Sequence, residues 1–278
     1  MSCDCAVLKA ETHNITHLPE SIESMTAMKM IQINHGPLME LQEIGNYMPR
    51  LTKLNVDFNE LRTLPASLGK IADLAVVYAA FNRIVSIDGM LQENMGIVEL
   101  DLSTNNLVDF PNIAMRHLEL IALGNNSLTV LPDKLFESPF LVALNAEGNR
   151  LTSLPPRISR VGNVLWRLIV SRNNISALPS SINAMKALTI LDLRNNSFSA
   201  LPSFDELISL SHLTVSGNPL CANGWKGSGK VEELMSKEGE GCARQCSDMC
   251  LNTMTQDRGC DFECNVAECH FDNGKCQE

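Results

Sequence analysis

The sequence predicts an α/β solenoid: about ten turns of 23 residues, stacked into a horseshoe with a parallel sheet on its concave side, followed by a small disulfide-rich module. Three observations predict it. A short apolar motif recurs along most of the chain. Apolar residues make up 45% of the chain but aromatic residues only 5%, which suits stacked aliphatic layers. Eight of the ten cysteines fall between Cys221 and Cys276. We therefore divide the chain into a solenoid (1–220), a cap and linker (221–245) and a cysteine-dense module (246–278).

The recurring unit is clearest at residues 100–111, which read Leu-Asp-Leu-Ser-Thr-Asn-Asn-Leu-Val-Asp-Phe-Pro. Its first asparagine recurs every 21 to 24 residues, at Asn59, Asn82, Asn105, Asn126, Asn149, Asn173, Asn196 and Asn218. Two weaker units precede these, with His13 and Gly36 in the asparagine position. The pattern resembles the leucine-rich repeat family in its 23-residue form, in which Leu-Pro closes the repeat.

Each position of the unit has a physical reason. Leu-x-Leu predicts a short strand with both leucines in the core, and strands of neighbouring turns pair in parallel. The asparagine follows the strand, where its side chain can bond backbone groups that would otherwise be buried and unpaired. Leu-Pro then favours extended or turn backbone on the convex side. Because one turn cannot bury its own core edges, the ends of the stack need caps.

Residues that alternate with the core leucines should point to the concave side and form the ligand surface. Phe58 and Phe81 follow their strands by one position, and we expect them at the same rim. The alternative is that both phenylalanines are buried in the turns as a stacked spine. The predicted ligand-binding residues are Asp57, Phe58, Tyr78, Phe81, Glu99, Asp101, Asn145, Glu147, Arg167, Asp192, Arg194 and His212.

Charge and motifs exclude several function classes. The net charge is −10 and no basic stripe is present, which argues against a nucleic-acid partner and against contact with anionic membranes. The sequence contains no Gly-rich nucleotide loop, nucleophile elbow or His-Glu-x-x-His motif, so we expect no enzymatic activity and no cofactor. Four Asn-x-Ser/Thr sequons are candidate glycosylation sites: Asn14, Asn125, Asn174 and Asn195.

The cysteines favour disulfides over zinc. Cys221 and Cys242 bracket the segment after the last repeat, and a bridge between them would close a flap over the last core layer. Such a loop closure is worth about 3 kcal/mol. Cys246, Cys250, Cys260, Cys264, Cys269 and Cys276 follow, and the Cys-x3-Cys pairs among them fit a tetrahedral zinc site poorly. Disulfides place the protein outside the cytosol.

The six-cysteine segment, with Cys264-Asn265 and Asp272-Asn-Gly274, resembles the Notch repeat, also called the LNR module. The resemblance implies the pairs Cys246–Cys269, Cys250–Cys264 and Cys260–Cys276. It also implies a calcium site with ligands at Asp257, at Asp272 and at the residue before the last cysteine. That residue is Lys275, which offers no acceptor to a cation. We therefore expect calcium binding to be weak or absent, with the Lys275 ammonium replacing the ion or pointing into solvent.

Two functional interpretations remain open. In the first, the chain is a non-enzymatic ectodomain, or part of one, of a cell-surface or secreted protein that binds a protein or peptide on its concave face. In the second, it is an intracellular adaptor that scaffolds a signalling protein. No secretory signal stands in the first 30 residues, so the first interpretation implies a fragment with leader or anchor segments outside it. Cys3 and Cys5 are too close together to pair well with each other, which fits partners in such segments.

Overall fold

The computed structural model describes residues 6–91 and 96–222, together with Gly229, Val231 and Leu234. The predicted Notch-like module, the calcium residues Asp257, Asp272 and Lys275, and every cysteine other than Cys221 lie outside the described residues. The predicted pairings within the module therefore stay predictions.

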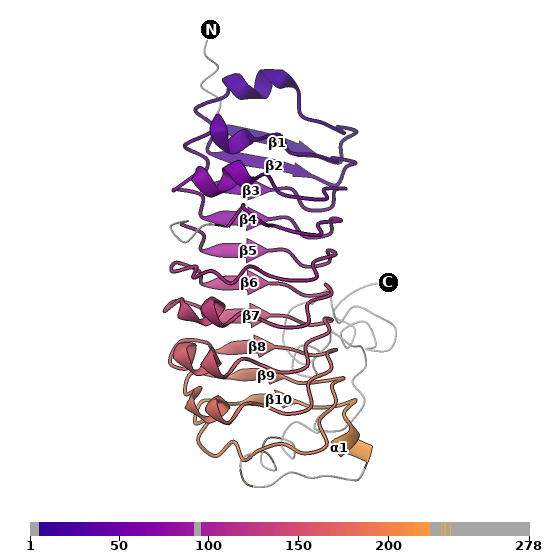
Figure 1. The fold of residues 1–278 in the computed structure, drawn as a ribbon, viewed down its shortest axis with the longest axis vertical. Coiled ribbons are helices and arrows are strands. Elements are labelled where there is room, and N and C mark those ends of the chain that lie inside the picture. Colours follow the sequence, from indigo (N-terminus) through magenta and orange to yellow (C-terminus); the bar gives the residue numbers. More distant parts are fainter. Residues whose placement is uncertain (1–5, 92–95, 223–228, 230, 232–233, 235–278) are drawn as a thin grey trace, which may run out of the picture.

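The described residues form a solenoid with one sheet of ten parallel strands, paired strictly in chain order (Figure 1). Each strand after the second is three residues long, and its central residue is in register with the central residues of its neighbours. The strands are β1 Val7–Glu11, β2 Met30–Asn34, β3 Lys53–Asn55, β4 Val76–Tyr78, β5 Glu99–Asp101, β6 Leu120–Ala122, β7 Ala143–Asn145, β8 Arg167–Ile169, β9 Ile190–Asp192 and β10 His212–Thr214.

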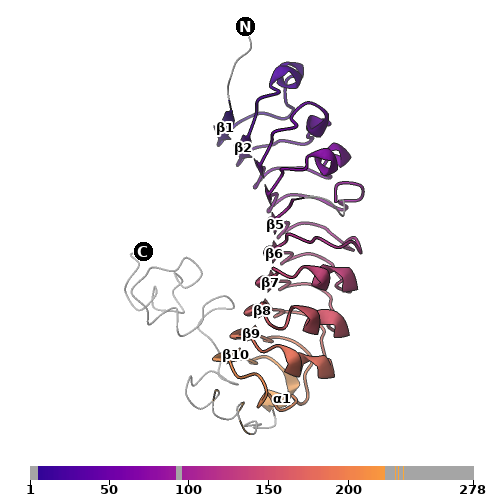
Figure 2. The ribbon, with the colours of Figure 1, turned by 90° about the vertical axis from the view of Figure 1, so that its left-hand side faces the viewer.

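The stack is curved, with the sheet on its concave side (Figure 2). Short 3-10 helices lie on the opposite, convex side: η1 Glu20–Ser24, η2 Ile44–Asn46, η3 Ala66–Lys70, η4 Asp133–Glu137, η5 Pro156–Val161 and η6 Ser180–Ala184. All but η2 begin after a proline in extended conformation, such as Pro65 with φ −66° and ψ 138°. This confirms that Leu-Pro fixes extended backbone there, although the sequence did not predict the 3-10 helices.

The core is a continuous column of aliphatic side chains between the sheet and the convex helices. Both leucines of the Leu-x-Leu strands are buried as predicted; Leu100 and Leu102 are 2% and 0% exposed. The predicted asparagine bonds are also present. Asn105 Oδ1 accepts from Ile84 N of the preceding turn at 2.9 Å, and Nδ2 donates to Ala79 O of that turn at the same distance. Seven further asparagines repeat this arrangement, so the ladder joins adjacent turns across most of the solenoid.

In the first turn a histidine, and not an asparagine, supplies the side-chain acceptor for the backbone amide. Gly36 stands in the asparagine position of the second turn and cannot accept from the amide of Ile15. His13 Nδ1 accepts from Ile15 N instead, at 3.0 Å. A Cβ atom on residue 36 would come within 2.2 Å of the His13 ring, so the glycine leaves the space that the imidazole needs.

The last described turn ends in the short helix α1, Pro219–Ala222, whose Leu220 is buried. Cys221 on this helix is disulfide-bonded. A bridge at this point agrees with the expected covalent cap, and its assignment to Cys242 stays a prediction.

Candidate functional site

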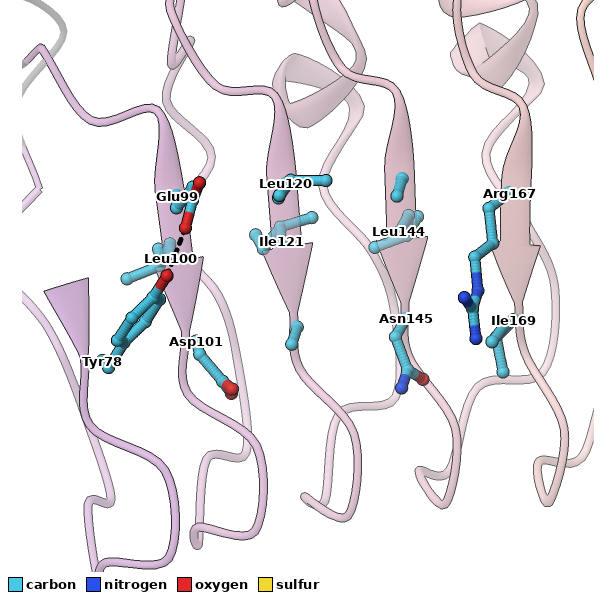
Figure 3. Close-up of a pocket in the computed structure, with 12 residues that line it drawn as sticks. Tyr78, Glu99, Leu100, Asp101, Leu120, Ile121, Leu144, Asn145, Arg167 and Ile169 are labelled. Carbon is cyan, nitrogen blue, oxygen red and sulfur yellow. Dashed lines mark hydrogen bonds between the residues drawn. The ribbon is translucent and has the colours of Figure 1, made fainter. Parts of the chain in front are cut away.

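A pocket of about 380 Å³ lies on the concave sheet and extends across five neighbouring strands, β4 to β8 (Figure 3). Most of its walls and floor are the strand residues that the sequence pattern places on this side. The lining residues are Tyr78, Glu99, Leu100, Asp101, Leu120, Ile121, Ala122, Ala143, Leu144, Asn145, Arg167 and Ile169. The fold thus brings five of the predicted ligand-binding residues together in one pocket: Tyr78, Glu99, Asp101, Asn145 and Arg167.

Tyr78 is held in place at the β4 end of the pocket. Its hydroxyl donates to Glu99 Oε2, and the Lys53 ammonium lies 4.8 Å from the centre of its ring. The hydrogen bond to Glu99, followed by burial, raises the pKa of Tyr78 to about 12. The phenol therefore stays protonated at physiological pH and acts as a neutral, oriented wall.

The pocket changes character from one end to the other. Glu99 and Asp101 give the β5 side two carboxylates, whereas the floor over β6 and β7 is uncharged and, apart from Asn145, apolar. Leu120, which is not among the predicted ligand-binding residues, is 39% exposed on this floor. Arg167 closes the β8 side, and its guanidinium has no carboxylate partner among the described residues. In Figure 3 Asp101 and Arg167 lie on either side of the apolar floor.

Asp57 follows β3 and lies beside the acidic end of the pocket. Its Oδ1 accepts from Ala80 N at 2.7 Å, which ties it to the next turn. Burial, and to a lesser degree repulsion from Asp101, raise the pKa of Asp57 from 3.8 to about 6. His35 interacts with this carboxyl and lowers its pKa, but by less than burial raises it, so the negative charge is poorly compensated at neutral pH.

We expect Asp57→Asn to stabilise the fold at pH 7.5 by about 1 to 2 kcal/mol, with the gain disappearing below pH 4. The folded state prefers the protonated acid, so stability is lost as pH rises from the unfolded pKa of 3.8 through the folded value of about 6. Asparagine keeps the acceptor for Ala80 N and removes the charge. Urea unfolding at several pH values measures this; an equal effect at pH 4 and pH 7.5 would contradict it.

Other predicted residues point to the same face but are less accessible. Glu147 is 7% exposed, Asp192 4% and Arg194 5%. Asp192 and Arg194 form a buried ion pair, with Nη2 and Oδ2 2.7 Å apart. His212 is half-buried, and its Nδ1 lies 2.8 Å from Ser211 Oγ. These four residues lie at the β7–β10 end and outside the pocket lining.

Phe58 and Phe81 form a stacked, partly exposed ladder at the rim where the strands end. Their ring centroids are 4.2 Å apart with planes 8° apart, and His35 stacks on Phe58 at 4.4 Å. The two phenylalanines are 41% and 47% exposed, so they face the rim and do not form a buried spine. His35 was missed by the sequence analysis, although it occupies the same repeat position as both phenylalanines.

The three stacked residues all have left-handed backbone, with φ of 58°, 55° and 53° for His35, Phe58 and Phe81. The same conformation recurs in every turn, in the residue that precedes the repeat asparagine or the His13 or Gly36 that replaces it. There it turns the chain out of the strand. For a residue with a side chain it costs about 1 to 2 kcal/mol. Ring stacking stabilises each pair by about 0.5 to 1.5 kcal/mol, which offsets part of that strain.

The remaining site predictions concern modification and metals. The four sequon asparagines, Asn14, Asn125, Asn174 and Asn195, are all exposed, which leaves each open to a glycan. Within the described residues, no three His, Cys, Asp or Glu side chains are grouped so as to hold a metal ion. None of the described helices has the length and apolarity to cross a membrane.

Comparison with known proteins agrees with this architecture. Residues 163–220 match the family described as leucine rich repeat. The chain is 28% identical over 185 residues to human leucine-rich repeats and immunoglobulin-like domains protein 3, a match that covers 63% of this chain and 16% of that protein. It is 22% identical over 215 residues to bovine lumican, which covers 75% of this chain and 62% of lumican. The chain thus spans less than two thirds of each relative.

Solved structures at this level of identity support the fold alone. The functional domain of InlJ from Listeria monocytogenes superposes with a TM-score of 0.69 at 21% identity, covering 82% of this chain and 47% of that one. The leucine-rich-repeat ectodomain of a plant membrane receptor kinase from Arabidopsis thaliana, solved in complex with CASPARIAN STRIP INTEGRITY FACTOR 2, gives a TM-score of 0.53 at 24% identity. That match covers 73% of this chain and 31% of the receptor chain. The curated relatives are non-enzymatic, which confirms that expectation for this chain.

Proposed function

We propose that this leucine-rich-repeat protein binds a protein or peptide ligand on its concave face, as the ectodomain, or part of the ectodomain, of a cell-surface or secreted protein. The observation that carries the proposal is the pocket across β4 to β8. It combines an exposed apolar floor with oriented polar side chains at its ends, as ligand sites generally do. A solenoid also offers an extended concave surface on which a chain can lie across many strands.

The comparisons support both parts of the proposal. The curated relatives are secreted or cell-surface leucine-rich-repeat proteins, which favours an extracellular location over the intracellular adaptor. The Arabidopsis receptor of the same fold was solved with a bound partner. The disulfide at Cys221 also fits an oxidising compartment.

Peptides selected from a displayed library against the full oxidised chain test the proposal. We expect Ala143→Arg to weaken the selected peptides at least about tenfold, because the new side chain fills the floor of the pocket and removes about 1.4 kcal/mol or more of binding energy. Ala177→Arg is the matched control, since Ala177 is exposed and lies outside the sheet. Equal affinity for both variants, measured by surface plasmon resonance, would refute the concave site.

A more specific variant tests the predicted residues together. Simultaneous replacement of Tyr78, Asp101 and Arg167 by alanine should lower the affinity for the same peptides more than about threefold, even if each contact contributes only a fraction of a kcal/mol. A smaller change would mean that these side chains do not contact the ligand.

A further inference from the structure

The charges of the concave pocket are separated into two poles with an uncharged floor between them. The acidic pole consists of Asp57, Glu99 and Asp101 on the turns of β3 and β5. The basic pole is Arg167 on β8. We name these two groups the acidic pole and the basic pole.

Neighbouring charged residues do not cancel the net charge of either pole. Lys53 adds one positive charge over the Tyr78 ring, but three carboxylates, Glu99, Asp101 and Asp57, act on the same tyrosine. On the other side, Asp192 is neutralised by Arg194 at 2.7 Å and does not cancel Arg167. Over β6 and β7 the outward strand positions are Leu120, Ala122, Ala143 and Asn145, none of which carries a charge.

Strand spacing fixes the distance between the poles. Asp101 lies on β5 and Arg167 on β8, three strand intervals apart, which corresponds to about 14 Å. An extended peptide advances about 3.3 to 3.6 Å per residue, so about four residues span that distance. The apolar floor lies beneath the residues in between and accepts small or aliphatic side chains.

From this arrangement we infer that the preferred ligand is a dipolar peptide segment that crosses the strands, with a basic side chain over Asp101 and an acidic side chain about four residues away over Arg167. The inference rests on the proposed concave site and specifies its ligand class. It does not fix the chain direction of the peptide, because a segment with the two charges exchanged can bind in the reverse direction.

A series of peptides with increasing charge separation tests the spacing. The probes are Lys-(Ala)n-Glu peptides with blocked ends and an uncharged fluorophore, with n from about zero to six, titrated with the full oxidised chain. We expect the tightest binding with about three or four intervening residues. Adjacent charges should bind about fivefold more weakly, because only one pole can then be engaged, and one exposed ion pair is worth up to about fivefold in affinity. Affinity that does not vary with n overturns the inference.

Paired substitutions test the position of each pole. Arg167→Gln should weaken the best Lys–Glu peptide about fivefold and leave its Lys–Gln counterpart unchanged. Asp101→Asn should weaken the Lys–Glu peptide and spare the Gln–Glu counterpart, while asparagine keeps the acceptor for Ser103 N. If Arg167→Gln weakens the Lys–Gln peptide equally, the basic pole does not bind the acidic side chain and the inference is wrong.

The two proposals fail in different ways. Peptides that lose affinity in Ala143→Arg regardless of their charges support the concave site and overturn the dipolar ligand. Peptides that respond to charge spacing but not to Ala143→Arg would bind elsewhere, which overturns both. Charge-dependent binding that is also lost in Ala143→Arg supports both.

Discussion

Replacing Asn105 by alanine should destabilise the solenoid by about 2 kcal/mol, because a backbone group left buried without a partner costs about 1 to 3 kcal/mol. The side chain is 7% exposed and bonds two turns. Without it, Ile84 N loses its acceptor and is left unpaired. The carbonyls of Ala79 and Leu102 each lose one donor but keep another, from Asn82 Nδ2 and Asn126 Nδ2 of the neighbouring turns.

The adjacent residue is a matched control for this prediction. Asn106 has the same chemistry one position later but is exposed, and only its backbone amide bonds the preceding turn, at Ile84 O. Asn106→Ala should therefore change stability by less than about 0.5 kcal/mol. Asn105→Asp should fall between the two, since it keeps the acceptor and loses the donor. Urea unfolding of the full oxidised chain measures the stability of all three variants. A loss below about 1 kcal/mol for Asn105→Ala would show that the asparagine hydrogen bonds do not hold the turns together.

The sequence predicts the solenoid well because its information is local and repeated. One Leu-x-Leu strand and one asparagine specify the contacts of a turn with its neighbours, and each later copy, such as Leu191, Leu193 and Asn196, repeats the same bonds. The convex 3-10 helices were not predicted. Their i to i+3 bonds are few, and η2, η3, η5 and η6 are held mainly by packing against adjacent turns, which no single repeat reveals.

The sequence predicted which face of the sheet the side chains of the candidate site point to, but not which neighbours surround them. Strand alternation places Tyr78, Asp101 and Arg167 on one face, and the structure brings them into one pocket. Alternation could not indicate that Asp192 and Arg194 would pair with each other and be buried, because that depends on the close approach of their side chains. It also could not select Leu120, since an exposed leucine has no distinctive pattern beside many buried ones.

Gly45 is a position where the convex side of the stack leaves no room for a side chain. It is buried in η2, and its amide donates to Ser67 Oγ in η3 at 3.1 Å. A Cβ atom on residue 45 would lie 2.0 Å from Ser67 O and 2.3 Å from Ser67 C, both of them backbone atoms that cannot rotate away. The two turns must therefore separate, which breaks the amide bond and opens the packing between η2 and η3.

We expect Gly45→Ala to cost about 2 to 3 kcal/mol, the usual range for overpacking where the backbone must shift. Gly124→Ala is the control: it is also a buried glycine of the solenoid, but its Cβ would meet nothing closer than 3.6 Å. That variant should change stability by less than about 0.5 kcal/mol. Ser67→Ala separates the two contributions, since it removes the acceptor for Gly45 N without a clash and should cost about 1 kcal/mol. If Gly45→Ala is no more destabilising than Gly124→Ala in urea unfolding, adjacent turns can separate freely on the convex side, and steric contact between η2 and η3 does not set their spacing.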